Sequence, residues 1–183
     1  MILMFLANGF EEIEALTPLD CLRRVGETVV TVGIGGREIT GSHGITVLAD
    51  TDDTHLPAET PDMVILPGGM PGSSTLDTSP VVDRVLADAA ARGACLAAIC
   101  AAPMVLGKRG YLNGKQATCF PGFEEHLHGA TVRRDTGVVQ DGNVITAAGM
   151  GVALDFALIL VAERQGSKVA CSLRAALQAP PRT

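Results

Sequence analysis

The chain has 183 residues, of which 47% are apolar and 19% are charged, and its formal net charge is −6. This length suits a single domain over residues 1–183 with one sizeable core. The acidic balance argues against a nucleic-acid partner, which needs a basic face, and the apolar content argues against disorder. No apolar run approaches the ~20 residues of a membrane helix, so we expect no membrane partner.

The first predicted element is an apolar strand at residues 1–7. It does not resemble a secretory signal, because no basic residue precedes it and Glu11, Glu12 and Glu14 follow it closely. The five cysteines are odd in number and form no Cys-x-x-Cys pair. Free thiols in a reducing compartment are the better interpretation, and we therefore expect a cytoplasmic protein.

Strand-like and helix-like segments then alternate along the chain. In chain order, the pattern predicts a helix over 10–25, a strand over 28–32, a hairpin strand over 45–48, a strand over 63–66, a helix over 79–92, a strand over 95–99 and a helix over 102–108. Such alternation indicates a mostly parallel sheet with helices on both faces. Sheets of this kind bind ligands at the carboxyl ends of their strands.

The last third of the chain has a different pattern. Residues 136–140 and 143–146 flank Asp141-Gly142, which is a strong signal for a β-hairpin. The remaining predicted elements are a long apolar helix over 151–164, a short helix over 168–178 and a frayed tail over 179–183.

Cys100 is the first candidate for chemistry. It directly follows an apolar strand and precedes a helix that begins Ala101-Ala102-Pro103. A sharp strand-to-helix turn presents its corner residue at the sheet edge, as in a nucleophile elbow. The helix dipole and free N–H groups there favour a thiolate over a thiol. The alternative, an ordinary core cysteine, is the interpretation we keep for Cys21, Cys95 and Cys171.

The glycine-rich loop Pro67–Gly72 is the second candidate. Glycines after a strand allow backbone N–H groups to point at a bound anion or a developing oxyanion. The loop has neither the Gly-Lys-Ser/Thr of a P-loop nor a G-x-G-x-x-G dinucleotide motif. Because turns are often glycine-rich without a function, the loop is informative mainly through its expected place beside Cys100.

Glu14 is the third candidate. It lies among apolar residues early in the helix that follows the first strand, so we expect it at the same sheet edge as Cys100. A partly buried carboxyl group there stays protonated and can serve as a hydrogen-bond donor or proton shuttle. Periodicity alone equally allows a solvated helix face. Glu11 and Glu12 are interpreted as ordinary acids of a first helical turn.

The four histidines give little information. His43, His55, His126 and His128 form no His-x-x-x-His or His-Glu-x-x-His pattern, and the cysteines lack zinc-site spacing. We predict no metal site. His126 is a candidate to approach the pocket from a loop, with a solvated loop position as the alternative, and the sequence assigns no Cys–His dyad.

Three segments together resemble the ThiJ/PfpI superfamily. They are Ala7–Ala15, Val64–Gly69 and Ala97–Pro103. Their order and spacing are specific, and the closest similarity is to bacterial-type members of the DJ-one (parkinsonism-associated protein deglycase) branch. The similarity extends through Leu154–Ala157.

The resemblance implies a flavodoxin-like three-layer α/β sandwich of the class I glutamine amidotransferase type, usually homodimeric and active without a cofactor. Cys100 matches the nucleophile in a strained elbow, and Glu14 matches the acid that hydrogen-bonds its sulfur and lowers its pKa. Gly69 and the Ala101 N–H match oxyanion-site donors, with Gly68 as a further pocket residue. Family members act on glyoxal, methylglyoxal or glycated proteins, whereas others respond to peroxide or behave as chaperones.

The chain departs from the family pattern at several positions. Ala101 stands where the protease-like branch has a histidine, so we do not expect peptidase activity. Cys119 and Phe120 occupy the place of a pocket histidine in animal relatives, which leaves Cys119 as a possible second thiol. Ala148 replaces a pocket arginine, and His43 stands where a relative has an arginine near the dimer contact.

Two functional hypotheses result. In the first, Cys100 attacks a small-molecule carbonyl substrate such as methylglyoxal, or a glycated protein, and Glu14 moves the protons. In the second, the chain is a redox sensor or chaperone-like stress protein that uses oxidation of Cys100. Both need the same two side chains, so the sequence does not separate them. A catalytically idle domain fits poorly, because perturbed groups cluster at functional sites.

Overall fold

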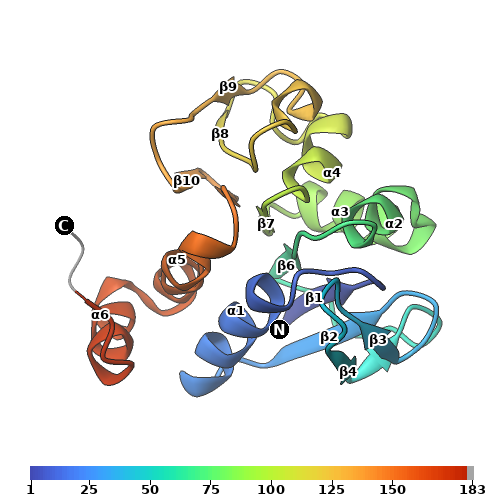
Figure 1. Cartoon of the computed structure of the whole chain (residues 1–183), viewed down its shortest axis with the longest axis horizontal. Helices are drawn as coiled ribbons and strands as arrows, with labels where there is room; N and C mark the ends of the chain where they lie inside the picture. Colours follow the sequence, from blue (N-terminus) through green and yellow to red (C-terminus); the bar gives the residue numbers. More distant parts are fainter. Residues whose placement is uncertain (181–183) are drawn as a thin grey trace.

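A seven-stranded sheet lies at the centre of the computed structural model, which describes residues 1–180 (Figure 1). Its strands are β1 (Ile2–Leu6), β2 (Val29–Gly33), β5 (Thr51–Asp52), β6 (Met63–Leu66), β7 (Cys95–Ile99), β10 (Val138–Asp141) and β11 (Val144–Ala147). The order across the sheet is β10-β11-β7-β6-β1-β2-β5. Only the pairing of β10 with β11 is antiparallel. The predicted flavodoxin-like fold class is confirmed.

Helices cover both faces of this sheet (Figure 1). They are α1 (Glu12–Arg24), α2 (Gly72–Thr78), α3 (Pro80–Ala91), α4 (Pro103–Lys108) and α5 (Ala153–Gln165), and a sixth helix, α6 (Ser167–Ala176), follows α5. Alternation along β1 sets the two faces, because successive side chains of a strand point to opposite sides. Met4 joins a core with Leu22 of α1 and Phe156 of α5, whereas Phe5 joins a second core with Leu86 of α3.

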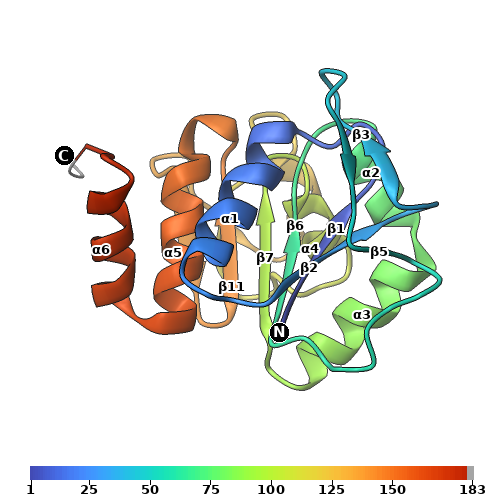
Figure 2. The same cartoon turned by 90° about the horizontal axis from the view of Figure 1, so that it is seen from below.

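The helix α6 does not lie on the sheet. Figure 2 shows it beyond α5, and Ala170 and Leu173 place its buried side in the core that α5 shares with α1. None of the helices within residues 1–180 has the length and apolar content needed to cross a membrane.

Smaller elements lie in the connections. They are β3 (Glu38–Thr40), β4 (Thr46–Leu48), β8 (Gln116–Ala117), β9 (Thr131–Val132) and the short 3₁₀ helices η1 (Glu124–His126) and η2 (Met150–Val152). Strands β3 and β4 pair as an antiparallel hairpin, which confirms the hairpin expected around residues 45–48.

The sequence-based elements agree with the structure except in short or boundary segments. Helix α2 was not predicted, because its seven residues include a single buried large apolar side chain, Leu76, and so have no helical periodicity. Asp141 belongs to β10 rather than to the expected turn, and Gly142 takes the positive φ that the turn needs. Residues 181–183 of the expected tail lie outside the described residues.

Candidate active site

Cys100 lies at the sharp turn that follows β7. Its φ of 65° is in the left-handed region, which costs a non-glycine residue about 1–3 kcal/mol and persists only where neighbours enforce it. Here the Cys100 N–H donates to the Ala147 carbonyl at 2.8 Å, and the Phe120 N–H donates to the Cys100 carbonyl at 2.9 Å. These bonds support the strained elbow that the resemblance implied.

Glu14 reaches the same place from the first turn of α1. Its side chain is almost fully buried, and its carboxyl group hydrogen-bonds the Cys100 thiol. The Gly68 N–H donates to Glu14 Oε2 at 3.1 Å. Glu14, Gly68 and Cys100 follow β1, β6 and β7, which are neighbours in the sheet. The predicted meeting of these residues at the carboxyl edge is therefore confirmed.

Two backbone donors complete the surroundings of the sulfur. The N–H groups of Gly69 and Ala101 hydrogen-bond Cys100, as expected for both residues. Gly69 has a φ of 89°, and a Cβ there would collide with the backbone of residues 9–11, so only glycine suits this position.

Burial dominates the electrostatics of the pair. Burial, together with the nearby charge of Glu11, raises the pKa of Glu14 to about 7 despite its hydrogen bonds to Cys100, Gly68 and Met150. Burial and then the negative charge of an ionised Glu14 raise the pKa of the Cys100 thiol to about 12, against the lowering effect of the two N–H donors. The pair therefore holds two protons below about pH 7 and one proton above it.

This result corrects the expectation that the surroundings simply acidify the thiol. With Glu14 ionised, two negative charges would share a buried site, which opposes a thiolate. With the proton on Glu14, the repulsion disappears and the carboxyl group becomes a donor to the sulfur. When the pair holds one proton, a Cys100 thiolate therefore requires that proton to reside on Glu14.

The remaining pocket candidates, Cys119 and His126, lie in different surroundings. Cys119 is buried in the core that contains Leu86, and burial raises the pKa of its thiol to about 11. His126 lies in η1, where its ring contacts Phe123 and its Nε2 lies 3.8 Å from Glu125. The role assigned to each stays a prediction.

Phe120 lies near Glu14 and Cys100. A Cβ built on Gly149 would have the Phe120 ring and Glu14 Oε1 both within 4 Å, and the Phe120 side chain is 43% exposed. Sequence reasoning marked position 120 as a departure from the family but gave no role to its ring.

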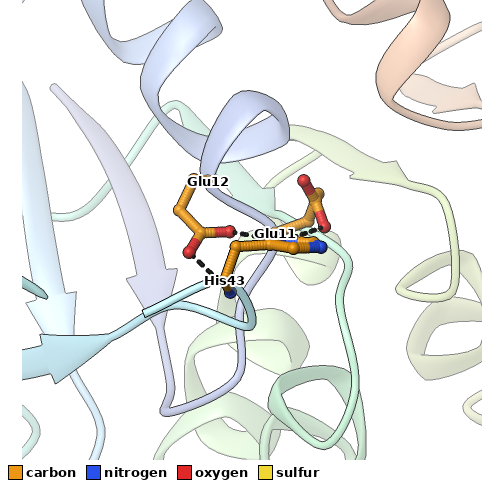
Figure 3. Close-up of side chains that lie close together, drawn as sticks. All are labelled: Glu11, Glu12 and His43. Atoms are coloured by element: carbon orange, nitrogen blue, oxygen red, sulfur yellow. Dashed lines mark hydrogen bonds and ion pairs between the residues drawn. The ribbon is translucent and has the colours of Figure 1, made fainter. Parts of the chain in front are cut away.

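Glu11, Glu12 and His43 form the one group within residues 1–180 whose ligand atoms are spaced to hold a metal ion (Figure 3). The sequence analysis predicted no metal site, because these residues form no known ligand motif. They meet only because a hairpin folds onto the start of α1.

The raised pKa of Glu14 predicts a pH-dependent stability. Above the ordinary pKa of 4.5 the unfolded chain releases this proton while the folded chain holds it up to about pH 7. The free energy of unfolding therefore falls as the pH rises through this window, by roughly 3 kcal/mol. Denaturant titrations from pH 4 to 8 would measure it.

Two variants serve as references for this measurement. Glu14→Gln should lose this part of the pH dependence, whereas Glu38→Gln, at an exposed position on β3, should keep it. Equal pH dependence in Glu14→Gln and the wild type would contradict the assignment.

A methyl group at Gly68 should destabilise the fold. Its Cβ would lie within 3.0 Å of Glu14 Oε2, the Cys100 Cβ and the Ile99 carbonyl. We expect Gly68→Ala to lower the free energy of unfolding by about 1–3 kcal/mol. The matched control is Gly151→Ala, where a Cβ meets nothing within 4 Å. Equal stability of the two variants in thermal and denaturant unfolding would show that Gly68 is not tightly packed against Glu14 and Cys100.

Comparison with known proteins agrees with this geometry. Protein dj-1beta of Drosophila melanogaster is 38% identical over 168 residues, which are 91% of this chain and 90% of the relative. A glutathione-independent glyoxalase of Caenorhabditis elegans, DJR-1.2, is 32% identical over 89% of this chain and 87% of its own length.

The crystal structure of Drosophila melanogaster DJ-1beta superposes with a TM-score of 0.93 at 35% identity, covering 98% of both chains. Residues 1–163 match the family described as DJ-1/PfpI. The chain therefore belongs to the DJ-1/PfpI family, as its three motifs and its catalytic-edge geometry indicate.

Proposed function

We propose that the chain is a cofactor-independent enzyme of the glyoxalase or deglycase type, which converts α-oxoaldehydes such as methylglyoxal or acts on their adducts with proteins. The observation that carries this proposal is the Cys100 sulfur held beside the Glu14 carboxyl group and the N–H groups of Gly69 and Ala101. The glyoxalase relative supports the same reaction class.

The first step forms a bond between the Cys100 sulfur and the aldehyde carbon of the substrate. The carbonyl electrons move to oxygen, and the N–H groups of Gly69 and Ala101 are placed to stabilise that oxyanion. A preorganised donor of this kind typically contributes about 3–4 kcal/mol. Protonation of the oxygen by the neutral Glu14 gives a hemithioacetal and leaves Glu14 as a carboxylate.

Glu14 then moves a proton between adjacent carbons. Its carboxylate takes the proton from the former aldehyde carbon, and the resulting enediol is protonated on the neighbouring carbon. The first carbon is thereby oxidised to a thioester and the second is reduced to an alcohol, so no external oxidant is needed. Water cleaves the carbon–sulfur bond, which releases a 2-hydroxy acid and regenerates the thiol.

A pKa near 7 suits a group that both donates and accepts a proton during the reaction. A general acid–base catalyst works best when its pKa lies near the working pH, and burial raises the pKa of Glu14 to about 7. The proposed reaction therefore needs no histidine at position 120, where this chain has phenylalanine.

Lactate formation from methylglyoxal, without glutathione, tests the proposal. We expect Cys100→Ser to abolish turnover, since the serine hydroxyl is a far weaker nucleophile. Glu14→Gln should lower kcat/KM by about 100-fold or more. Cys171→Ser, which changes an exposed cysteine of α6, is the control and should retain wild-type turnover. Full activity in Cys100→Ser would disprove the mechanism.

Oxidation of Cys100 is the second candidate function. Its half-buried position admits a small oxidant, whereas Cys21, Cys95 and Cys119 are buried. Attack of the thiolate on hydrogen peroxide forms a sulfur–oxygen bond, breaks the oxygen–oxygen bond and releases water. A second peroxide yields a sulfinate, whose oxygens the neutral Glu14 and the two N–H groups would stabilise.

Mass spectrometry after mild peroxide treatment separates the two functions. A gain of two oxygens confined to Cys100, together with negligible methylglyoxal turnover, would favour the sensor. Oxidation of the exposed Cys171 ahead of Cys100 would count against it. The expected homodimer and cytoplasmic location remain predictions under either function.

A further inference from the structure

The group formed by Glu11, Glu12 and His43 lies outside the proposed catalytic pair (Figure 3). Glu11 and Glu12 open α1, whereas His43 comes from the loop between β3 and β4. His43 Nδ1 lies 3.2 Å from Glu12 Oε2 and 3.4 Å from Glu11 Oε2. The two carboxylates and the imidazole nitrogen all lie within 4.8 Å of one another.

These separations fit ligands that share one ion. Zinc binds imidazole nitrogen and carboxylate oxygen at about 2.0–2.2 Å, so tetrahedral ligands lie roughly 3.3–3.5 Å apart. The distances from His43 Nδ1 to the two carboxylate oxygens are near this range. Small rotations of the carboxylates would bring the Glu11 and Glu12 oxygens to the same separation. The Ser42 hydroxyl, 3.1 Å from Glu11 Oε2 and 3.0 Å from His43 Nδ1, lies at the edge of the same group.

The two carboxylates are buried without a fixed positive partner. Their side chains are only 11% and 6% exposed, and within residues 1–180 neither forms an ion pair with lysine or arginine. The N–H groups of His43 and Ile45 donate to Glu12 Oε1 at 2.8 and 3.4 Å, whereas Glu12 Oε2 faces His43 Nδ1. A cation between Glu11 and Glu12 would offset the repulsion of the two buried carboxylates.

Main-chain hydrogen bonds help to hold the framework around the group. The Ser42 N–H donates to the Phe10 carbonyl at 2.8 Å, and the Gly9 N–H donates to the Thr40 carbonyl at 2.8 Å. Gly41 lies so close to the Glu12 carboxylate that a Cβ there would collide with it. The hairpin is therefore fixed against α1 before any ligand binds, which lowers the entropic cost of binding.

We propose that Glu11, Glu12 and His43 form a binding site for one divalent cation of the zinc type. One imidazole and two carboxylates suit borderline metals such as Zn²⁺ and Co²⁺ better than Ca²⁺ or Mg²⁺, which prefer all-oxygen shells. The His43 side chain is 68% exposed in the single chain, and three protein ligands leave at least one position of the ion for water. The site lies at the rim of the catalytic loop, because the Glu11 N–H donates to the Gly68 carbonyl.

A protonated His43 is the competing explanation, since an imidazolium would neutralise part of the charge without any metal. His43→Arg separates the two. Arginine keeps a positive charge beside the carboxylates but cannot bind a cation. His55→Gln is the matched control, because His55 is also an exposed histidine paired with a carboxylate, Asp52 at 2.9 Å, but has only that one.

Titration with Co²⁺, followed by visible absorption and by calorimetry, tests the proposal. We expect one ion per chain for the wild type and His55→Gln, and at least about tenfold weaker binding for His43→Arg and Glu12→Gln. Zn²⁺ should displace the bound Co²⁺ and raise the Tm of the wild type but not of His43→Arg.

Three outcomes would overturn the site. The first is the absence of stoichiometric binding to the wild type. The second is unchanged binding in a folded His43→Arg, which would show that His43 is not a ligand. The third is a cobalt spectrum with an intense near-ultraviolet band from a thiolate ligand, which would place the ion on a cysteine instead.

Discussion

The hydrogen bond from the Gly68 N–H to Glu14 joins the two parts of the molecule on which the proposed chemistry depends. It connects the loop after β6 to the first turn of α1, and the same loop passes so close to Cys100 that no side chain fits at residue 68. Because β1, β6 and β7 are adjacent and parallel, this contact sets the separation of acid and sulfur. The sheet fixes the positions of the strand ends. Because Gly68 has no Cβ, the loop after β6 can approach both Glu14 and Cys100.

Most of this arrangement could be predicted from the residues alone. Apolar runs at β6 and β7, each followed by a turn or a helix start, predict parallel strands whose carboxyl ends share one edge. Cys100 and Glu14 come directly after such strands, so their meeting needs no long-range information. The long helices α1, α3 and α5 were also predictable, because their apolar residues recur with helical spacing.

What could not be predicted arises from contacts between segments far apart in the chain. The pKa of Glu14 depends on its burial and on hydrogen bonds with Cys100, Gly68 and Met150, and no local pattern encodes those contacts. His43 reaches Glu12 across 31 positions of sequence, through a hairpin docked by backbone bonds. The ring of Phe120 lies beside Gly149 for the same reason. Sequence motifs describe functional residues that lie on one helix or strand, whereas these groups combine residues from several elements.

The contact between residue 120 and the elbow is made by the main chain. The N–H of Phe120 holds the Cys100 carbonyl, and every amino acid except proline carries that donor. The side chain at this position is therefore free to change while Cys100 keeps its conformation. Such a separation lets one scaffold acquire a histidine, a small residue or an aromatic ring beside its acid, and so vary in substrate preference without rebuilding the elbow.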